Sequence, residues 1–341
     1  MITRWPSIAL GASLLYAPHV LSLSPSDIPS DTPISSLVAS AKANLASGKA
    51  NDALTYFDVA ISRDPENYLT IFQRGATYLS LGNSGKASLD FDKALSIRPD
   101  FEGALLQRAK IKSRNADWTG AKEDYEKAKK TESAEYALLD EAAGAALLAA
   151  DADRNADWEG CVGHAGTAIL VASTSLALRQ IRARCRLERG EVLEAISDLQ
   201  HTLQIAPSST EPHLQISSML YFAVNDRDKG LEQLKKCLRS DPDSRACSKM
   251  LRREKNLNKS LAQLEKLKGK RQYNSAVKLL IKQGEDPGLI AEVKEEVETA
   301  KAAGYIHKNS PNDLHDGLVE TACGLYSEVR GDSGTSTAFA D

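Results

Sequence analysis

Most residue patterns that mark a catalytic or metal site are missing from this 341-residue chain. Its five cysteines include no Cys-x-x-Cys pair, which argues against a zinc site or a dithiol redox motif. The six histidines form no pair at metal-binding spacing and stand in no nucleophile motif, and glycine-rich phosphate loops are absent. We therefore expect no catalytic residue, no metal and no cofactor, and we predict that the chain is not an enzyme.

An excess of basic charge is also missing. The formal net charge is −3 and the isoelectric point about 6.1, so nothing indicates a nucleic-acid surface. The chain has only 6 Phe and 3 Trp, and strand-like alternation of apolar and polar residues is hard to find, which favours an all-helical fold. After the N-terminal segment no run of eighteen apolar residues occurs, so we expect no membrane span in the mature chain.

A period of 34 residues is the strongest positive signal. Four positions with the pattern small, aromatic, small and proline recur in register: Ala53, Phe57, Ala60 and Pro65 return as Ala87, Phe91, Ala94 and Pro99. Small residues let two helices cross closely, the aromatic ring fills the gap, and the proline ends the second helix. This period and pattern are typical of the tetratricopeptide repeat. The predicted fold is therefore an all-α tetratricopeptide-repeat superhelix, a right-handed α-solenoid of about seven helix pairs in two to three subdomains.

The repeats give a predicted division of the chain. It comprises a signal peptide (1–22), a linker expected to be extended or disordered (23–33), repeats one to three (34–135), repeats four to six (136–244), a long helix with repeat seven and half of repeat eight (245–329), and a disordered tail (330–341). A buried first helix is the alternative for 1–22. The pattern Asp-Trp-x-Gly at 117–120 returns forty residues later, so 136–141 is predicted to be an extended helix or a joint. A final half-repeat would leave its last apolar face exposed.

Tetratricopeptide arrays bind ligands along the inner surface formed by the first helix of each repeat. Inward positions in repeats one to three carry apolar residues, which we predict to bind clients: Val38, Leu45, Leu69, Phe72, Leu79 and Leu106. An apolar stripe on a nominally solvated face marks a surface for apolar partners. The alternative is that some of these side chains pack between helices, because inward and buried positions differ by one residue.

Two further site predictions concern modification. Cys237 and Cys247 flank a tight turn, which predicts that they lie side by side and form a disulfide in a secreted chain; two small core residues are the alternative. Cys161 and Cys185 are interpreted as small-residue positions. The sequence Asn258-Lys259-Ser260 is a glycosylation sequon, although it falls within a predicted helix.

Two stretches of the second half carry a more specific resemblance. With the signal sequence and the repeats, SLALRQIRARCRLERGEVLEAISDLQ and KKCLRSDPDSRACSKMLRREKNLNKSLAQLEKL resemble one family of endoplasmic-reticulum DnaJ-type co-chaperones. Its members carry tetratricopeptide repeats ahead of a C-terminal J domain and are also known in animals as inhibitors of eIF2α kinases. The resemblance implies that the N-terminal subdomain binds exposed apolar segments of misfolded proteins and that the J domain stimulates the lumenal ATPase BiP.

The sequence departs from this family at one place. It contains no His-Pro-Asp, the J-domain motif that engages the ATPase, and it stops inside the expected eighth repeat. We therefore expect a truncated chain that lacks the J domain, holds unfolded clients in the endoplasmic-reticulum lumen and does not itself trigger ATP hydrolysis. The alternative is a scaffold that binds one folded partner, such as a stress-response kinase, through its convex or basic helical surfaces.

Overall fold

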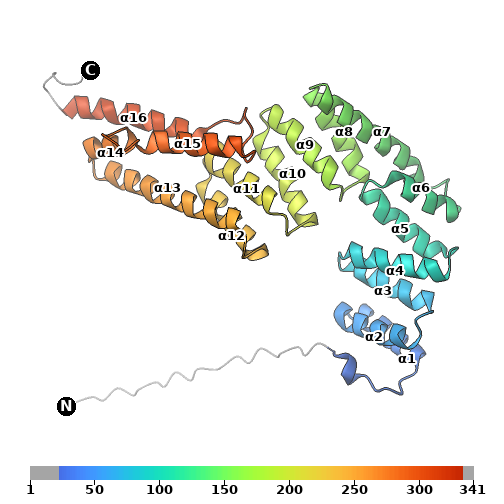
Figure 1. Ribbon diagram of the computed structural model, residues 1–341. Coiled ribbons are helices and arrows are strands. Elements are labelled where there is room, and N and C mark those ends of the chain that lie inside the picture. The colour runs from blue at the N-terminus through green and yellow to red at the C-terminus, as the bar shows by residue number, and fades with distance from the viewer. Residues whose placement is uncertain (1–22, 333–341) are drawn as a thin grey trace, which may run out of the picture. The chain divides into compact units, whose positions relative to one another are not determined.

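A computed structural model describes residues 23–332 of the chain (Figure 1). The predicted signal peptide at 1–22 and the last nine residues of the predicted tail lie outside the described residues. The described part forms sixteen α-helices and two short helical segments, with an isolated β-bridge between Gln283 and Asp286 and no strand. The prediction of an all-α fold is confirmed. No helix between residues 23 and 332 combines the length and the apolar character needed to cross a membrane.

The described chain divides into two compact units. The first ends at residue 111 and also includes 124–129, and the second comprises 112–123 and the chain from 130 onward. Helix α6 (Trp118–Lys127) therefore contributes to both units. The first unit otherwise contains η1 (Pro25–Asp27), α1 (Ile34–Ala46), α2 (Ala50–Arg63), α3 (Tyr68–Ser80), α4 (Ser84–Ile97) and most of α5 (Glu102–Arg114). The subdomain boundary that the sequence predicts at 136–141 stays a prediction.

The repeated small and aromatic residues form the contacts between paired helices in the first unit. The side chains of Phe57 and Phe91 are fully buried, as are those of the alanines four residues before each of them. Helices α3 and α4 approach closely at Gly75, where an added Cβ would lie 2.9 Å from a ring carbon of Phe91. Asn67 and Asn83 cap α3 and α4 by accepting hydrogen bonds from the backbone N–H groups of Thr70 and Lys86.

The predicted linker at 23–33 contains the short helical segment η1 and packs against repeat one, while Ser24 and Ile28 have the extended backbone that the sequence predicts. Ser24 and Asp27 form a capping box around η1. Ile28 is buried against Leu37 and Ala60 of repeat one. Arg63, at the end of α2, donates hydrogen bonds to the carbonyl oxygens of Pro29 and Thr32. One apolar side chain and one arginine thus hold a segment whose Ser- and Pro-rich composition predicts disorder.

The second unit continues the pairs of helices. It contains α7 (Ala134–Arg154), α8 (Trp158–Val171), α9 (Leu176–Glu188), α10 (Val192–Ile205), α11 (Thr210–Ser218), the π-helical turn η2 (Met219–Ala223), α12 (Arg227–Ser240), α13 (Arg245–Gly269), α14 (Tyr273–Leu280), α15 (Leu289–Ala302) and α16 (Asp313–Asp332). The six extra residues at 136–141 lie within α7, which is 21 residues long. Ser133, which stands where a proline is expected, caps this helix.

The last helices share one core, which changes two expectations about the C-terminal part. Leu314, Leu318, Ala322 and Leu325 of α16 are buried in the cluster that α13, α14 and α15 also line. The apolar face of the predicted half-repeat is therefore covered, because α16 packs against α14 and α15. Helix α16 also extends to Asp332, so the first three residues of the predicted disordered tail are helical.

Candidate functional site

The six predicted client-binding residues differ in exposure. Leu69, at the start of α3, is 46% exposed. The other five, Val38, Leu45, Phe72, Leu79 and Leu106, are half-buried and pack against the cores of their own repeats. The predicted client-binding set thus contains one exposed leucine and five side chains that are partly packed.

Phe72 shows why sequence spacing alone does not separate inner from buried positions. Its ring lies 5.6 Å from that of Phe91 and 5.0 Å from that of Phe101, measured between ring centroids. An added Cβ on Gly103 would lie 3.2 Å from Phe72, so the absence of a side chain there leaves room for the ring. Phe72 therefore stabilises the junction between repeats two and three, and only part of its ring faces outward.

A buried arginine–aspartate pair recurs in the first unit and was missed in the sequence. Arg74 donates two hydrogen bonds to Asp90, and Arg108 donates two to Asp124, each across sixteen residues. Each arginine also bonds an aspartate sixteen residues before it, Asp58 or Asp92, on the preceding repeat. These bonds raise the pKa of both guanidinium groups further above its usual range. The sequence does contain a signal for these pairs, because the arginines and the aspartates repeat at the same 34-residue interval as the aromatic positions.

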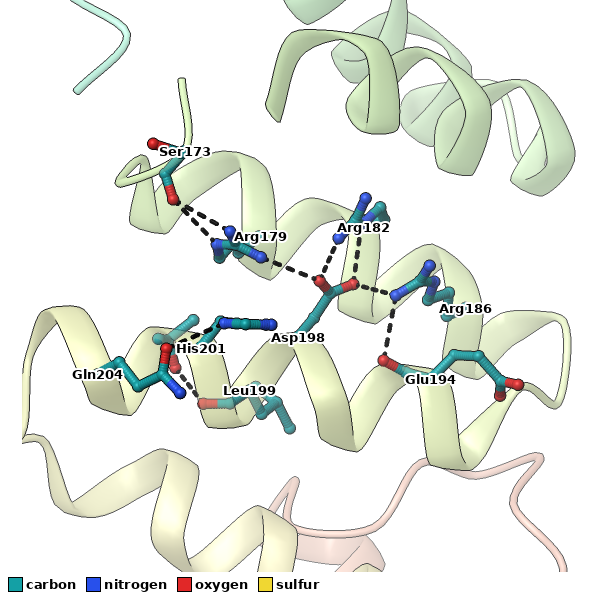
Figure 2. A network of polar contacts seen from close by, with 10 residues as sticks. Ser173, Arg179, Arg182, Arg186, Glu194, Asp198, Leu199, His201 and Gln204 are labelled. Atoms are coloured by element: carbon teal, nitrogen blue, oxygen red, sulfur yellow. Dashed lines mark hydrogen bonds and ion pairs between the residues drawn. The ribbon is translucent and has the colours of Figure 1, made fainter. Parts of the chain in front are cut away.

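Repeat five carries the most extended version of this pair. Figure 2 shows the Asp198 carboxylate of α10 between three arginines of α9. Arg182 donates to it through Nε at 2.9 Å and Nη2 at 2.5 Å, and Arg186 donates through Nη1 at 2.6 Å. The Arg179 guanidinium lies 3.6 Å away and also donates to the carbonyl of Ser173. Burial lowers the pKa of Arg179 and the Asp198 charge opposes that shift. The carboxylate is saturated with donors, so its role is to join α9 to α10.

Arg182 lacks the second aspartate that Arg74 and Arg108 have. The equivalent position, sixteen residues before Arg182, is Gly166 on α8, and an added Cβ there would lie 3.7 Å from Arg182 Nη1. We expect Gly166→Asp to stabilise the second unit by about 0.5–1 kcal/mol more than Gly163→Asp does. Gly163 lies on the same helix with open space around it, so that control removes an equally flexible residue without reaching an arginine. Urea unfolding measures both, and equal stabilities would contradict the added ion pair.

A disulfide joins repeat four to repeat five. Cys161 of α8 and Cys185 of α9 are bonded, with their Cα atoms 6.2 Å apart. The interpretation of these cysteines as plain small-residue positions is therefore wrong. The two residues meet because α8, the second helix of repeat four, packs against α9, the first helix of repeat five. Asp153 lies 3.5 Å from the Cys185 sulfur and is paired with Arg184. Because the sulfurs are bonded to each other, they offer no thiolates to a metal at this cluster.

The second disulfide and the sequon both involve α13. Cys237 of α12 and Cys247 of α13, the pair predicted from the sequence, are joined across the turn between these helices. Cys323 is an exposed free thiol. Asn258 is half-buried on α13, and its Oδ1 accepts hydrogen bonds from Tyr221 Oη and Arg227 Nη1. Glycosylation of Asn258 stays a prediction.

Repeat six replaces the arginine–aspartate pair with a buried carboxyl group. Ser217 stands at the arginine position, and its Oγ lies 2.7 Å from the carbonyl oxygen of Gly230 and 3.2 and 3.3 Å from the two oxygens of Glu254. The hydroxyl of Ser217 has one proton, which the Gly230 carbonyl and the Glu254 carboxyl group share as acceptors, so Glu254 receives little compensation for its burial. Burial raises the pKa of Glu254 to about 8 despite the opposing effect of the Ser217 bond, and the nearby Glu296 charge adds to the rise.

The inner face of repeats five and six is partly covered by the loop between α15 and α16. Glu188 at the end of α9 bonds His307 and Asn309 of this loop, each at 3.1 Å, and Lys308 lies 3.8 Å away. Ile306, which belongs to this loop, is buried. A cleft of about 520 Å³ remains, with Gln180 and Gln215 of the inner helices on one side and the loop on the other.

Comparisons with known proteins agree with this architecture. A sequence profile described as tetratricopeptide repeat matches residues 70–101. The tetratricopeptide repeat and J domain-containing co-chaperone DNJ1 of Fusarium oxysporum f. sp. lycopersici is 44% identical over 318 residues, which cover 93% of this chain and 61% of that protein. DnaJ homolog subfamily C member 3 of Homo sapiens is 29% identical over 241 residues, which cover 68% of this chain and 48% of the human protein. The crystal structure of the P58(IPK) TPR domain matches with a TM-score of 0.65 and 25% identity, covering 87% of this chain and 82% of that one.

The helix pairs and their 34-residue spacing define the protein as a tetratricopeptide-repeat protein with an all-α solenoid fold. Its homologues are the tetratricopeptide repeat and J domain-containing co-chaperones, among them DNJ1 and DnaJ homolog subfamily C member 3. The chain spans about half to three-fifths of the length of these relatives, 48% of the human and 61% of the Fusarium protein.

Proposed function

We propose that this chain is the client-binding part of a DnaJ-type co-chaperone and acts by holding unfolded segments of other proteins, without catalysis. The observation that carries the proposal is the exposure of Leu69 on α3, at a position that the sequence predicts to face inward, with the half-buried Phe72 one turn away. An exposed apolar side chain on an inner face offers a contact for chain segments that folded proteins bury. The names of the homologues, which describe co-chaperones, support the same class of function.

We place this activity in the endoplasmic-reticulum lumen, with a BiP-type ATPase receiving the client and eIF2α kinases as further candidate partners. Two disulfides support an oxidising compartment, because bonded cysteines are rare in proteins of the reducing cytosol. The relatives are described as J domain-containing, and a J domain is the part that would engage the ATPase. For this chain alone the proposal is restricted to holding the client.

The first test is a charge substitution at Leu69. We expect the parent chain to suppress aggregation of a reduced, denatured client and Leu69→Glu to lose most of that protection, since a charge opposes burial of apolar segments. Light scattering at equal molar ratios measures the effect. Phe72 is less suitable for this substitution than Leu69. Its ring packs against Phe91 and Phe101, so a charge there would also damage the fold.

The matched control is Leu170→Glu. Leu170 is 84% exposed on α8, a second helix of its repeat and thus off the inner face, so the substitution adds the same charge elsewhere. Protection should remain in this variant. If Leu69→Glu protects as well as Leu170→Glu, the inner face of the first unit is not the client site.

A further inference from the structure

The exposed face of α13 carries positive charge along most of its length. Five basic residues recur at intervals of three, four or seven, which places them on one side of the helix: Arg245, Lys249, Arg252, Lys259 and Lys266. All five are exposed, whereas Leu257, Leu261 and Leu264 on the opposite side are buried. We call these five residues the basic face. It stands out in a chain whose formal net charge is −3.

The cations of the basic face are unpaired within the part of the chain that the structure describes. Between residues 23 and 332, no ion pair or side-chain hydrogen bond involves any of the five. The two acids of α13 do not compensate them, because Glu254 is buried on the other side and Glu265 pairs with Lys268. Arg182 and Arg186 of the same unit, in contrast, are matched by Asp198. The fold therefore leaves this group of charges available to another molecule.

The N-terminal end of the basic face borders a hollow of about 610 Å³. Its lining residues are Pro242, Asp243, Ser244, Arg245, Ser248, Lys249, Arg252 and Arg253. Arg253 is paired with Glu296, and Asp243 is the single acid in the lining. Three unpaired cations against one carboxylate give the hollow a net positive charge, and the helix N-terminus adds to it.

We propose that the basic face binds an extended acidic segment of a partner protein. Carboxylates form strong charge-assisted hydrogen bonds with Arg and Lys. The distance from Arg245 to Lys266 is about 32 Å along a helix, which an extended peptide of about ten residues would span. Helix α13 contains no aromatic residue on which nucleotide bases could stack, which disfavours single-stranded nucleic acid. It also has no large exposed apolar side chain that could enter a bilayer, which disfavours a membrane surface.

The test uses a fluorescein-labelled twelve-residue peptide in which Glu alternates with Gly or Ser, and the same peptide with Gln for Glu. We expect the full chain to bind the Glu peptide at low salt, to bind the Gln peptide at least about tenfold more weakly, and to release the Glu peptide as ionic strength rises. Fluorescence anisotropy gives the affinities. Client protection can fail while this binding persists, because the basic face shares no residue with the inner face of the first unit.

Two triple variants with equal charge change make the assignment specific. Arg245→Glu, Lys249→Glu and Arg252→Glu together should weaken binding of the Glu peptide at least about tenfold. Lys278→Glu, Lys282→Glu and Lys294→Glu, at exposed positions of the same unit without ion pairs in the described chain, should weaken it less than about threefold. Thermal melts by circular dichroism check that both variants fold. Equal losses in the two variants, equal binding of the Gln peptide, or tighter binding of a twelve-nucleotide RNA or phosphatidylserine vesicles through the same three residues would each overturn the proposal.

Discussion

Replacing Glu254 with Gln is expected to stabilise the second unit by about 3 kcal/mol at pH 7. Glu254 is 1% exposed, and among the described residues its carboxyl group bonds Ser217 alone, whose single proton is shared with the Gly230 carbonyl. Its pKa is about 8 in the folded chain against an ordinary value of 4.5. The folded state therefore holds a proton that the unfolded chain releases. A Gln amide can hydrogen-bond Ser217 in the same place and has no ionisable proton.

The stabilisation by Glu254→Gln depends on pH, because the parent chain loses stability as Glu254 ionises. Because the folded state binds the extra proton between pH 4.5 and about 8, stability of the parent chain falls as pH rises through that window and levels off above it. The advantage of Glu254→Gln should thus be below about 1 kcal/mol at pH 5 and reach its maximum near pH 8. Urea unfolding from pH 5 to 9 measures it through Trp118 and Trp158, which both belong to the second unit. Glu265→Gln, at an exposed position of the same helix, is the control and should show no such trend; a constant difference between Glu254→Gln and the parent would contradict the prediction.

Asp198→Asn is expected to destabilise the second unit by about 3–5 kcal/mol. The change leaves Arg182 and Arg186 without their shared carboxylate, although their side chains are only 16% and 19% exposed. Burying a guanidinium without its counter-charge costs far more than losing an exposed ion pair. The control is Asp151→Asn, whose partner Arg154 is exposed, and it should cost less than about 1 kcal/mol.

A double-mutant cycle separates this ion-pair network from a general packing defect. Adding Arg182→Met to Asp198→Asn should cost less than the two single changes together, because one stranded charge is then removed. Chemical unfolding of the four proteins gives the coupling energy. Additive costs, or an Asp198→Asn variant no weaker than Asp151→Asn, would show that the three arginines tolerate a neutral partner.

The helix pairs could be predicted from sequence because each repeat encodes its own packing. Phe57 and Phe91 fill the same gap in successive repeats, and their spacing is visible without any long-range information. The arginine–aspartate pairs were equally periodic, but charged residues on helices are expected on solvated faces, and that expectation hid them. Only the structure shows that Asp124 and Asp198 are buried.

Other features depend on contacts that no local pattern specifies. Composition predicts disorder for 23–33, yet the order of this segment depends on Ile28 finding a buried site and on Arg63 reaching two carbonyl groups. Leu69 is exposed whereas Phe72 is half-buried, because the ring of Phe101 lies against Phe72 and Gly103 leaves room for it. The Cys161–Cys185 bond likewise joins two repeats, and its pairing follows from their stacking.

Both disulfides close covalent loops in the chain, one between residues 24 apart and the other between residues 10 apart. A narrow pore or a processive protease draws a polypeptide through as a single strand. At each disulfide it would meet three strands side by side, the two arms of the closed loop and the chain that continues beyond it. Unfolding alone would not clear that obstruction. Passage of this chain through such a machine requires a thiol reductant to act first, at two separate places.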